Sequence, residues 1–207
     1  MKTSPFTLLR RACLIGLLLI IPVACTQAPA PSPALQNPTV ELDRVEVASY
    51  FPWPAPPPTV GPETPTPAPP PPSRIPLILA FVFNITNPNP YPVTMKDLQF
   101  TAEFEAAPNE FFQVGNPFAH EDMSIPANTT NQLRVTMVLD SLVAPGNLAV
   151  TSGFRLQELG LSAGAVIKNW WETVGDFGYK IKVSGGSAEF VSTGGDTIVG
   201  FEGLFPK

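Results

Sequence analysis

The chain has 207 residues, with 12 lysines and arginines against 17 aspartates and glutamates, and a net charge of −5 at neutral pH. Lys2, Arg10 and Arg11 are basic residues of the extreme N-terminus, so the remainder carries nine basic against 17 acidic residues, a net charge of −8. This balance argues against nucleic-acid binding, because phosphates are bound mainly through Lys and Arg. It also argues against electrostatic adhesion to anionic lipid.

The first 24 residues have the order of an export signal. Basic residues precede an apolar run from 12 to 21, and Pro22-Val23-Ala24-Cys25 follows. A membrane-spanning helix needs about 20 apolar residues, so we expect a cleaved signal peptide over residues 1–24. The stretch resembles the lipobox of bacterial lipoproteins, although Pro22 stands where that family usually has an aliphatic residue. The resemblance implies acylation of Cys25; the alternative is an ordinary cleaved signal with an incidental cysteine.

Acylation of Cys25 implies that fatty-acid chains make the membrane contact. Thr26 follows the cysteine in place of the Asp that commonly retains such proteins at an inner membrane. The resemblance therefore implies a cell-envelope protein, at the outer membrane of a host with two membranes and otherwise at the outer face of the cytoplasmic membrane. The only other cysteine is Cys13, so the processed chain has no internal disulfide and depends on its core for stability.

Two segments are rich in proline. Residues 25–39 consist largely of Pro, Ala, Ser, Gln and Asn, which predicts an extended tether. The second tract, Pro52 to Pro72, predicts a disordered insertion at 52–74 because it is too long for an ordinary connection. Its PxxP spacing leaves a peptide-recognition role open, although such spacing is hard to avoid at this proline density. The folded domain is thus expected over 40–207.

Most of this domain shows apolar residues alternating with polar ones, the pattern of half-buried β-strands. In the first strand, 40–47, the alternation is imperfect and indicates a bulge near Asp43. The run from Ile75 to Ile85 is almost continuously apolar, which is typical of a central strand covered on both faces or of a strand packed between a sheet and a helix. The remaining predicted strands are Leu98–Phe104, Leu133–Leu139, Tyr179–Val183, and a hairpin of Ala188–Val191 and Thr197–Phe205 around Gly194-Gly195-Asp196.

One stretch breaks this pattern. Apolar residues recur at spacings of three and four between Gly153 and Val174, which predicts one or two short helices with a break at Gly160. Trp170 and Trp171 lie in this stretch and are expected to pack in the core. Short strands with frequent turns and one helical excursion, at about 153–174, predict an all-β, antiparallel, immunoglobulin-like sandwich.

The end of the apolar strand carries the sequence Asn87-Pro88-Asn89-Pro90-Tyr91-Pro92. Proline lacks an N–H group and holds the preceding residue extended, so three X-Pro steps end a ladder strand without allowing a helix. Asparagine side chains can bond the freed backbone groups at such a turn. The residues themselves therefore indicate a stiff corner between two strands.

The same motif closely resembles a signature of the late-embryogenesis-abundant type 2 family, also called the water-stress and hypersensitive-response domain. The order of strands around it, including Ile125-Pro126-Ala127-Asn128 before one strand and Tyr179-Lys180-Ile181-Lys182 in another, extends the resemblance over most of 40–205. It implies a fibronectin-like sandwich and a role in tolerance of desiccation. Asn87, Pro88, Asn89, Pro90 and Pro92 enter only as structural positions, because the family has no catalytic residues to transfer.

The sequence offers little catalytic chemistry. His120 is the only histidine, and its neighbours Glu121 and Asp122 cannot all converge on one metal ion from regular structure. Without a second His or a free Cys, the usual nucleophile and base pairs are missing. Glu103 and Glu105 share one strand face, as a glycosidase pair can, but their polar neighbours favour a solvent-exposed face. We therefore expect neither an enzyme nor a cofactor.

Three functions fit these observations. The first is a non-enzymatic domain at the cell envelope that protects client proteins during water stress. The second is a lipid-binding or lipid-transfer module, in which Ile75–Phe83, Phe111 and Phe112 line a gap beside the helix. The third is an assembly or adhesion subunit that docks through the Pro-rich insertion. The expected partners are thus a membrane, through the acyl anchor, and client proteins or lipid.

Overall fold

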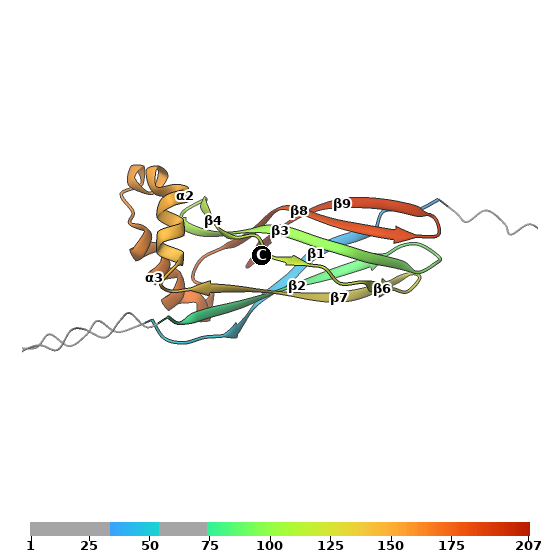
Figure 1. The fold of residues 1–207 in the computed structure, drawn as a ribbon, viewed down its shortest axis with the longest axis horizontal. Helices are drawn as coiled ribbons and strands as arrows, with labels where there is room; N and C mark the ends of the chain where they lie inside the picture. The colour runs from blue at the N-terminus through green and yellow to red at the C-terminus, as the bar shows by residue number, and fades with distance from the viewer. Residues whose placement is uncertain (1–33, 54–73) are drawn as a thin grey trace, which may run out of the picture. The chain divides into compact units, whose positions relative to one another are not determined.

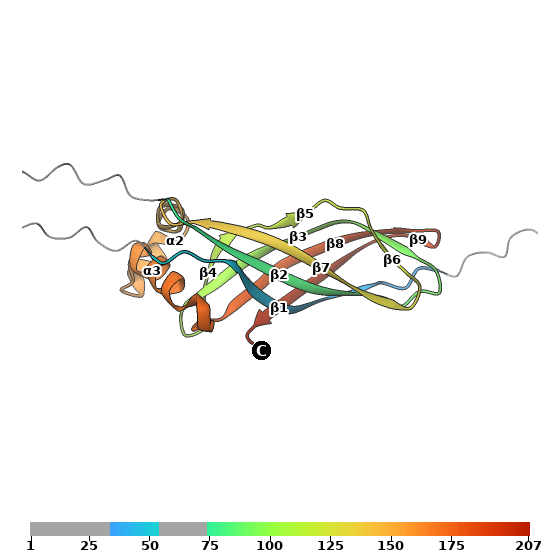
Figure 2. The same cartoon turned by 90° about the horizontal axis from the view of Figure 1, so that it is seen from below.

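A computed structural model describes residues 34–53 and 74–207. Two antiparallel sheets pack face to face, and two helices lie together at one end of the sandwich (Figures 1 and 2). The expected all-β sandwich with a helical excursion is therefore confirmed. The elements are β1 (Thr39–Ser49), β2 (Pro76–Asn87), β3 (Val93–Ala107), β4 (Glu110–Gly115), β5 (Phe118–Ala119), β6 (Met123–Ile125), β7 (Thr129–Asp140), α2 (Ala144–Glu158), α3 (Ala163–Thr173), the 3-10 turn η1 (Val174–Asp176), β8 (Ile181–Ser192) and β9 (Gly195–Phe205).

The first sheet has the order β1-β2-β7, so β2 is its central strand. Both faces of β2 are covered near its middle, since Phe81 is fully buried and Val82 on the opposite face is only 2% exposed; toward the strand ends the outward face is half-buried. Val82 stands between Arg44 of β1 and Arg134 of β7, both of which bind the carboxylate of Glu46. The stems of these long side chains can cover apolar surface while their charges stay in water, so no third layer is needed.

The second sheet has the order β4-β3-β8-β9, with β5 and β6 also pairing with β3. The alternation that predicted the long strand β3 is confirmed, because Leu98, Phe100, Ala102 and Phe104 are all buried. Phe100 meets Phe81 and Phe83 of the first sheet edge to face, with ring centroids 4.9 and 5.1 Å apart. Such pairs are worth about 0.5–1.5 kcal/mol beyond area burial, so they help to hold the sheets together.

Bulges interrupt several of the strand pairs, and two of them bear on the predicted strands. The pairing of β1 with β2 shifts between Leu42 and Arg44, which confirms the predicted irregularity near Asp43. The segments expected as separate strands at 179–183 and 188–191 instead form one strand, β8, interrupted by a bulge where Gly185 has a positive φ of 56°. Glycine adopts this conformation without a Cβ clash, so the chain bends and continues pairing on both sides.

The helices α2 and α3 and the turn η1 close one end of the sandwich, which we call the helical end (Figure 1). The helical region begins at Ala144 rather than near Gly153, as the spacing had indicated. Gly160 follows α2 with a φ of +67° and separates the helices as predicted, and the hydroxyl of Ser162 accepts a hydrogen bond from the Ala165 N–H at the start of α3. Among the described residues, no helix is long and apolar enough to cross a membrane.

Candidate functional site

Asn87 and Asn89 form the centre of the corner between β2 and β3, and both are fully buried. The Asn87 side-chain amide donates to the carbonyl of Tyr91 at 2.9 Å and to those of Ile125 and Pro126 at 3.1 Å. Its oxygen accepts the backbone N–H and the side-chain amide of Asn89, both at 2.9 Å. Of the prolines, Pro88 is half-buried, whereas Pro90 and Pro92 are exposed.

The same corner binds the beginning of the described chain. Asn89 exchanges two hydrogen bonds of 2.8 Å with the backbone of Gln36, and the Asn37 side chain accepts one from Thr197. The sandwich therefore starts before residue 40, inside the segment 25–39 that we expected as tether. Cys25, the expected lipidation site, lies outside the described residues, as do the expected signal peptide and most of the Pro-rich insertion.

The flanks of that insertion are fixed at the helical end. Trp53 contacts Trp171 edge to face at a centroid distance of 5.5 Å, and the Trp171 indole donates to the carbonyl of Phe51 at 2.7 Å. On the other flank, Ile75 exchanges hydrogen bonds with Ser141. Trp170 and Trp171 are each 1% exposed, which confirms the expectation that they are core residues.

The side chains considered for catalysis lie apart on the surface of the second sheet. His120 contacts the carboxylate of Asp97, and Asp122 pairs with Lys96 at 2.6 Å. Glu103 accepts a hydrogen bond from Ser184 at 2.5 Å and lies 3.4 Å from the Lys182 amine. In the part of the chain that the structure describes, no three His, Cys, Asp or Glu side chains converge as metal ligands.

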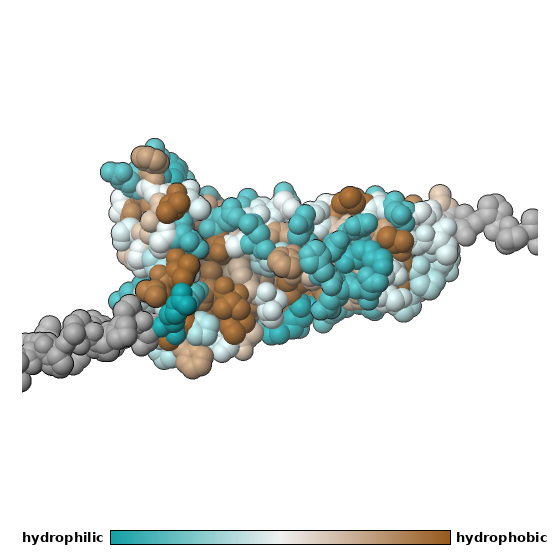
Figure 3. All heavy atoms as spheres, viewed as in Figure 1, coloured by the Kyte–Doolittle hydropathy of each residue, from teal (hydrophilic) through white to brown (hydrophobic). Residues whose placement is uncertain are grey.

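A gathering of exposed apolar side chains marks the helical end. On α2, Val150 is 87% exposed and Phe154 is 89% exposed. Tyr50 and Phe51 follow β1, Leu142 and Val143 precede α2, and all four are exposed too. On the face shown in Figure 3, hydrophobic residues gather where the helices meet the sandwich, whereas the middle of the sandwich is largely hydrophilic.

This gathering is not foreseen in the sequence, where Phe154 is one of the apolar residues whose spacing predicts a helix between Gly153 and Val174. Phe154 follows Val150 by four residues, Val150 follows Asn147 by three, and Asn147 follows Val143 by four. Residues at these spacings lie on one face of a helix. We call these four residues the α2 stripe. The intervals are visible in the sequence, but only the boundaries of α2 show that they form an outer face.

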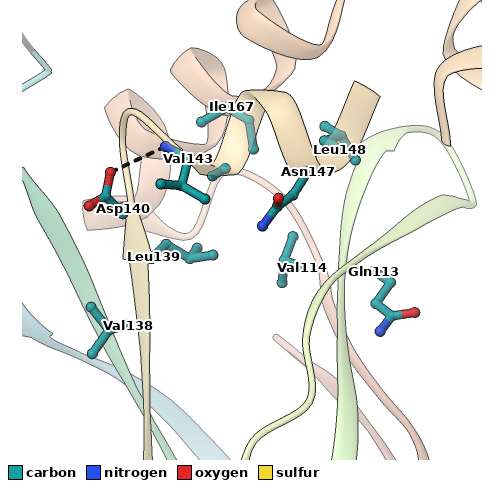
Figure 4. Close-up of a pocket in the computed structure, with 10 residues that line it drawn as sticks. Gln113, Val114, Val138, Leu139, Asp140, Val143, Asn147, Leu148 and Ile167 are labelled. Atoms are coloured by element: carbon teal, nitrogen blue, oxygen red, sulfur yellow. Dashed lines mark hydrogen bonds between the residues drawn. The ribbon is translucent and has the colours of Figure 1, made fainter. Parts of the chain in front are cut away.

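A pocket of about 180 Å³ lies beside the first residues of the stripe. Figure 4 shows side chains from four elements around it, including Val114 of β4, Val138 of β7, Leu148 of α2 and Ile167 of α3. Asp140 is the only ionisable residue among those lining the pocket. Its carboxylate accepts hydrogen bonds from the N–H groups of Leu142 and Val143, at 2.8 and 3.2 Å, which fixes the turn into α2.

The pocket differs from the gap suggested for a lipid. The inward side chains of β2 are buried in the core, and none of the residues 75–83 lines the pocket. Phe111 and Phe112 border a shallow depression against the outer surface of α2. These two groups of residues therefore do not meet in one cavity.

An ion pair fixes α2 to the second sheet. Arg155 binds the carboxylate of Glu110 on β4 and, at 2.9 Å, that of Glu158 one turn later on the helix. The hydrogen bonds from Arg155 hold the pKa of Glu110 below its ordinary value, against a smaller opposing effect of burial. The pair keeps α2 against β4 and so positions one wall of the pocket.

No family model and no curated protein matches the sequence. Among solved structures, the chain is similar to a protein from Archaeoglobus fulgidus, with 11% identity and a TM-score of 0.35 over 84% of this chain and 98% of that one. A structural-genomics target solved by X-ray has 12% identity and a TM-score of 0.36, covering 82% and 86%. A protein from Arabidopsis thaliana, solved in solution, has 10% identity and a TM-score of 0.36, covering 88% and 85%.

Proposed function

We propose that this protein is a non-enzymatic lipoprotein of the cell envelope, acylated at Cys25, that stabilises client proteins during water stress. The observation that carries the proposal is the exposure of apolar side chains at the helical end, above all Val150 and Phe154. Exposed apolar patches mark sites of interaction on soluble proteins. A surface of this kind suits transient contact with many clients better than it suits catalysis.

The charge of the chain supports the same function. A client that loses water exposes apolar groups, which bind the apolar helical end because burial of apolar area is favourable. The net charge of −8 outside the N-terminal signal region then keeps the complex solvated and repels other complexes. The resemblance of the Asn-Pro corner to the late-embryogenesis-abundant type 2 signature supports the stress-related role.

The proposal is tested by replacing Val150 and Phe154 with glutamine, a good helix former, in the full chain held in detergent micelles. An unrelated enzyme is dried and rehydrated with each variant, and its remaining activity and light scattering are measured. We expect the wild type to protect the enzyme beyond an equal mass of albumin, and the double variant to lose most of that protection. Micelles alone provide the baseline.

The matched control is Ile198→Thr on β9 of the second sheet. It also removes an exposed apolar side chain, since Ile198 is 72% exposed, but it lies outside the helices. Protection that falls equally in this control would contradict a specific role of the helical end. The lipid-carrier alternative is examined in the same preparation by native mass spectrometry. A stoichiometric acyl lipid other than the anchor would favour that alternative, because each buried CH₂ contributes about 0.8 kcal/mol to retention.

A further inference from the structure

The free edge of β7 lies beside the pocket. This strand pairs with β2 from Thr129 to Asp140 without a break in register, and within the described ranges no strand pairs with its other edge. Near its start, the Asn131 side chain donates to the carbonyl of Ser124 on β6 at 3.1 Å. Beyond that point the edge continues toward the helical end with no strand beside it.

This edge lacks the features that usually prevent pairing with another chain. Exposed edge strands commonly carry lysine, proline or a bulge, because their unpaired N–H and C=O groups otherwise recruit a further strand. The sequence of β7, TTNQLRVTMVLD, contains neither lysine nor proline, and its ladder has no bulge. Its single cationic residue, Arg134, is paired with Glu46 at 3.3 Å.

The pocket is placed to receive one side chain of a strand added to this edge. Val138 and Leu139 of β7 form one wall, and Val114 of β4 and Leu148 of α2 stand opposite. Its volume of about 180 Å³ is below the roughly 300–1,000 Å³ typical of small-molecule sites. A single large apolar side chain fits this space better than a complete acyl chain or a cofactor does.

The charges indicate what kind of strand binds. Asp140 is the only ionisable residue that lines the pocket, and its carboxylate is already paired with Arg74 at 3.5 Å. The charge that acts on a partner is therefore the net charge of −8 that the chain carries outside its N-terminal signal region. A basic segment is therefore attracted, whereas an acidic one is repelled. The α2 stripe continues from the pocket through Val150 to Phe154 and supplies further apolar contact.

We propose that the free edge of β7 binds an extended, apolar and basic segment of a client polypeptide by strand addition, with one apolar side chain in the pocket. Main-chain hydrogen bonds supply affinity in this mode and side-chain pockets supply selectivity. The inference rests on the proposed function, since it names the part of a client that is bound. It also explains how clients of different sequence are accepted, because every extended backbone offers the same hydrogen bonds.

The probe is a fluorescein-labelled peptide, Lys-Thr-Val-Thr-Phe-Thr-Val-Lys, titrated with the full chain in detergent micelles while fluorescence anisotropy is measured. A second peptide has the same side chains but N-methyl groups at alternate residues, which remove the N–H donors along one edge. We expect the first peptide to bind and the N-methylated peptide to bind at least tenfold more weakly. Equal binding of the two would overturn strand addition.

Two pairs of variants locate the site. Val138→Lys places the residue that protects natural edges on β7 and should weaken peptide binding at least tenfold, whereas Ile198→Lys on the edge strand β9 should change it less than twofold. Asn147→Trp fills the mouth of the pocket from α2 and should also weaken binding, whereas Gln157→Trp, exposed on the same helix, should not. Circular dichroism confirms that each variant is folded.

The outcomes separate this inference from the proposed function. Absence of peptide binding while the wild type still protects the dried enzyme would overturn strand addition and leave the proposed function intact. Peptide binding that depends on Val138 without any protection would contradict the proposed function alone. A concentration-dependent dimer that Val138→Lys dissociates would also overturn the inference, because the occupant of the edge would then be a second copy of this chain.

Discussion

Asn87 and Asn89, two residues apart in the corner after β2, are hydrogen bonded to each other and both are completely buried. The Asn87 side chain donates to the carbonyls of Tyr91, Ile125 and Pro126. The Asn89 side chain donates to the Gln36 carbonyl, and the Asn89 backbone carbonyl accepts the Asn128 N–H. Together they join three segments distant in the sequence. The prolines between and after them remove N–H groups that would otherwise need partners.

Asn87→Ala should therefore be strongly destabilising. The substitution removes a donor to the carbonyl of the buried residue Ile125 and the acceptor of the buried Asn89 backbone N–H, and each such group left unpaired costs about 1–3 kcal/mol. We expect the free energy of unfolding in urea to fall by about 3 kcal/mol or more. Asn131→Ala, which removes a half-buried asparagine whose side chain donates to the Ser124 carbonyl on β6, is the control and should cost far less; equal losses would show that the buried network is unimportant.

Tyr179→Phe should have the opposite effect. The Tyr179 hydroxyl is buried and finds no hydrogen-bond partner among the described residues, and burial raises the pKa of the phenol well above its ordinary value of 10.0. Its ring lies against Phe104 and Trp170, contacts that phenylalanine keeps. Because an unpaired buried polar group is costly, the variant should be as stable as the wild type or more stable by up to about 1 kcal/mol.

Trp170→Phe is the matched comparison in the same cluster. The Trp170 indole donates to the Glu105 carbonyl at 2.7 Å, so the loss of this donor and of ring volume should lower the unfolding free energy. Thermal and urea unfolding of both variants measure the difference. A destabilised Tyr179→Phe variant would indicate that the hydroxyl makes a bond, for instance to water.

The sandwich could be predicted because its strands alternate clearly. Leu133, Val135, Met137 and Leu139 are buried on β7 as their spacing implied. The alternation alone is enough to predict this strand, since one face of the sheet meets the core and the other meets water. The boundary of α2 could not be predicted, because Pro145 and Gly146 near its start and Gly153 within it are weak helix formers, and tertiary packing of Leu148 and Leu156 decides the helix.

The candidate binding surface was much less predictable. Val138 follows the alternation of β7 as an outward residue, yet nothing in the sequence shows that the strand forms an edge, because edge position depends on the pairing of distant strands. The pocket likewise combines residues from β4, β7, α2 and α3. By contrast, the corner was recognisable from a local motif, although the bond between Asn89 and Gln36 joins residues 53 positions apart.

The proposed anchoring through Cys25 gives a direct prediction. Cys25→Ser in the full chain should abolish fatty-acid labelling in cells and move the protein out of the membrane fraction, because serine offers no thiol to acylate. Cys13→Ser, within the expected signal peptide, should leave labelling unchanged. Labelling that persists in Cys25→Ser would contradict the lipoprotein assignment.

Glu46 should make stability depend on acid. Hydrogen bonds from Arg44, and more weakly from Arg134, hold its pKa below the ordinary value of 4.5. A carboxylate whose pKa is lower in the folded state stabilises the fold fully above its unfolded pKa, and the effect disappears as the pH falls through the folded pKa. Glu46→Gln should therefore lower the melting temperature at pH 7, and the difference from the wild type should shrink as the pH falls through the folded pKa of Glu46, where the wild-type side chain also becomes neutral.

Glu41→Gln on the same strand provides the comparison, since Glu41 is exposed and the same charge is removed. Melting temperatures of the three proteins are followed by circular dichroism from pH 7 to pH 3 at low and high salt. The gap between wild type and Glu46→Gln should close on acidification and narrow in high salt, because exposed ion pairs are screened. A difference in melting temperature that stays constant with pH would mean that Glu46 acts through packing rather than through its charge.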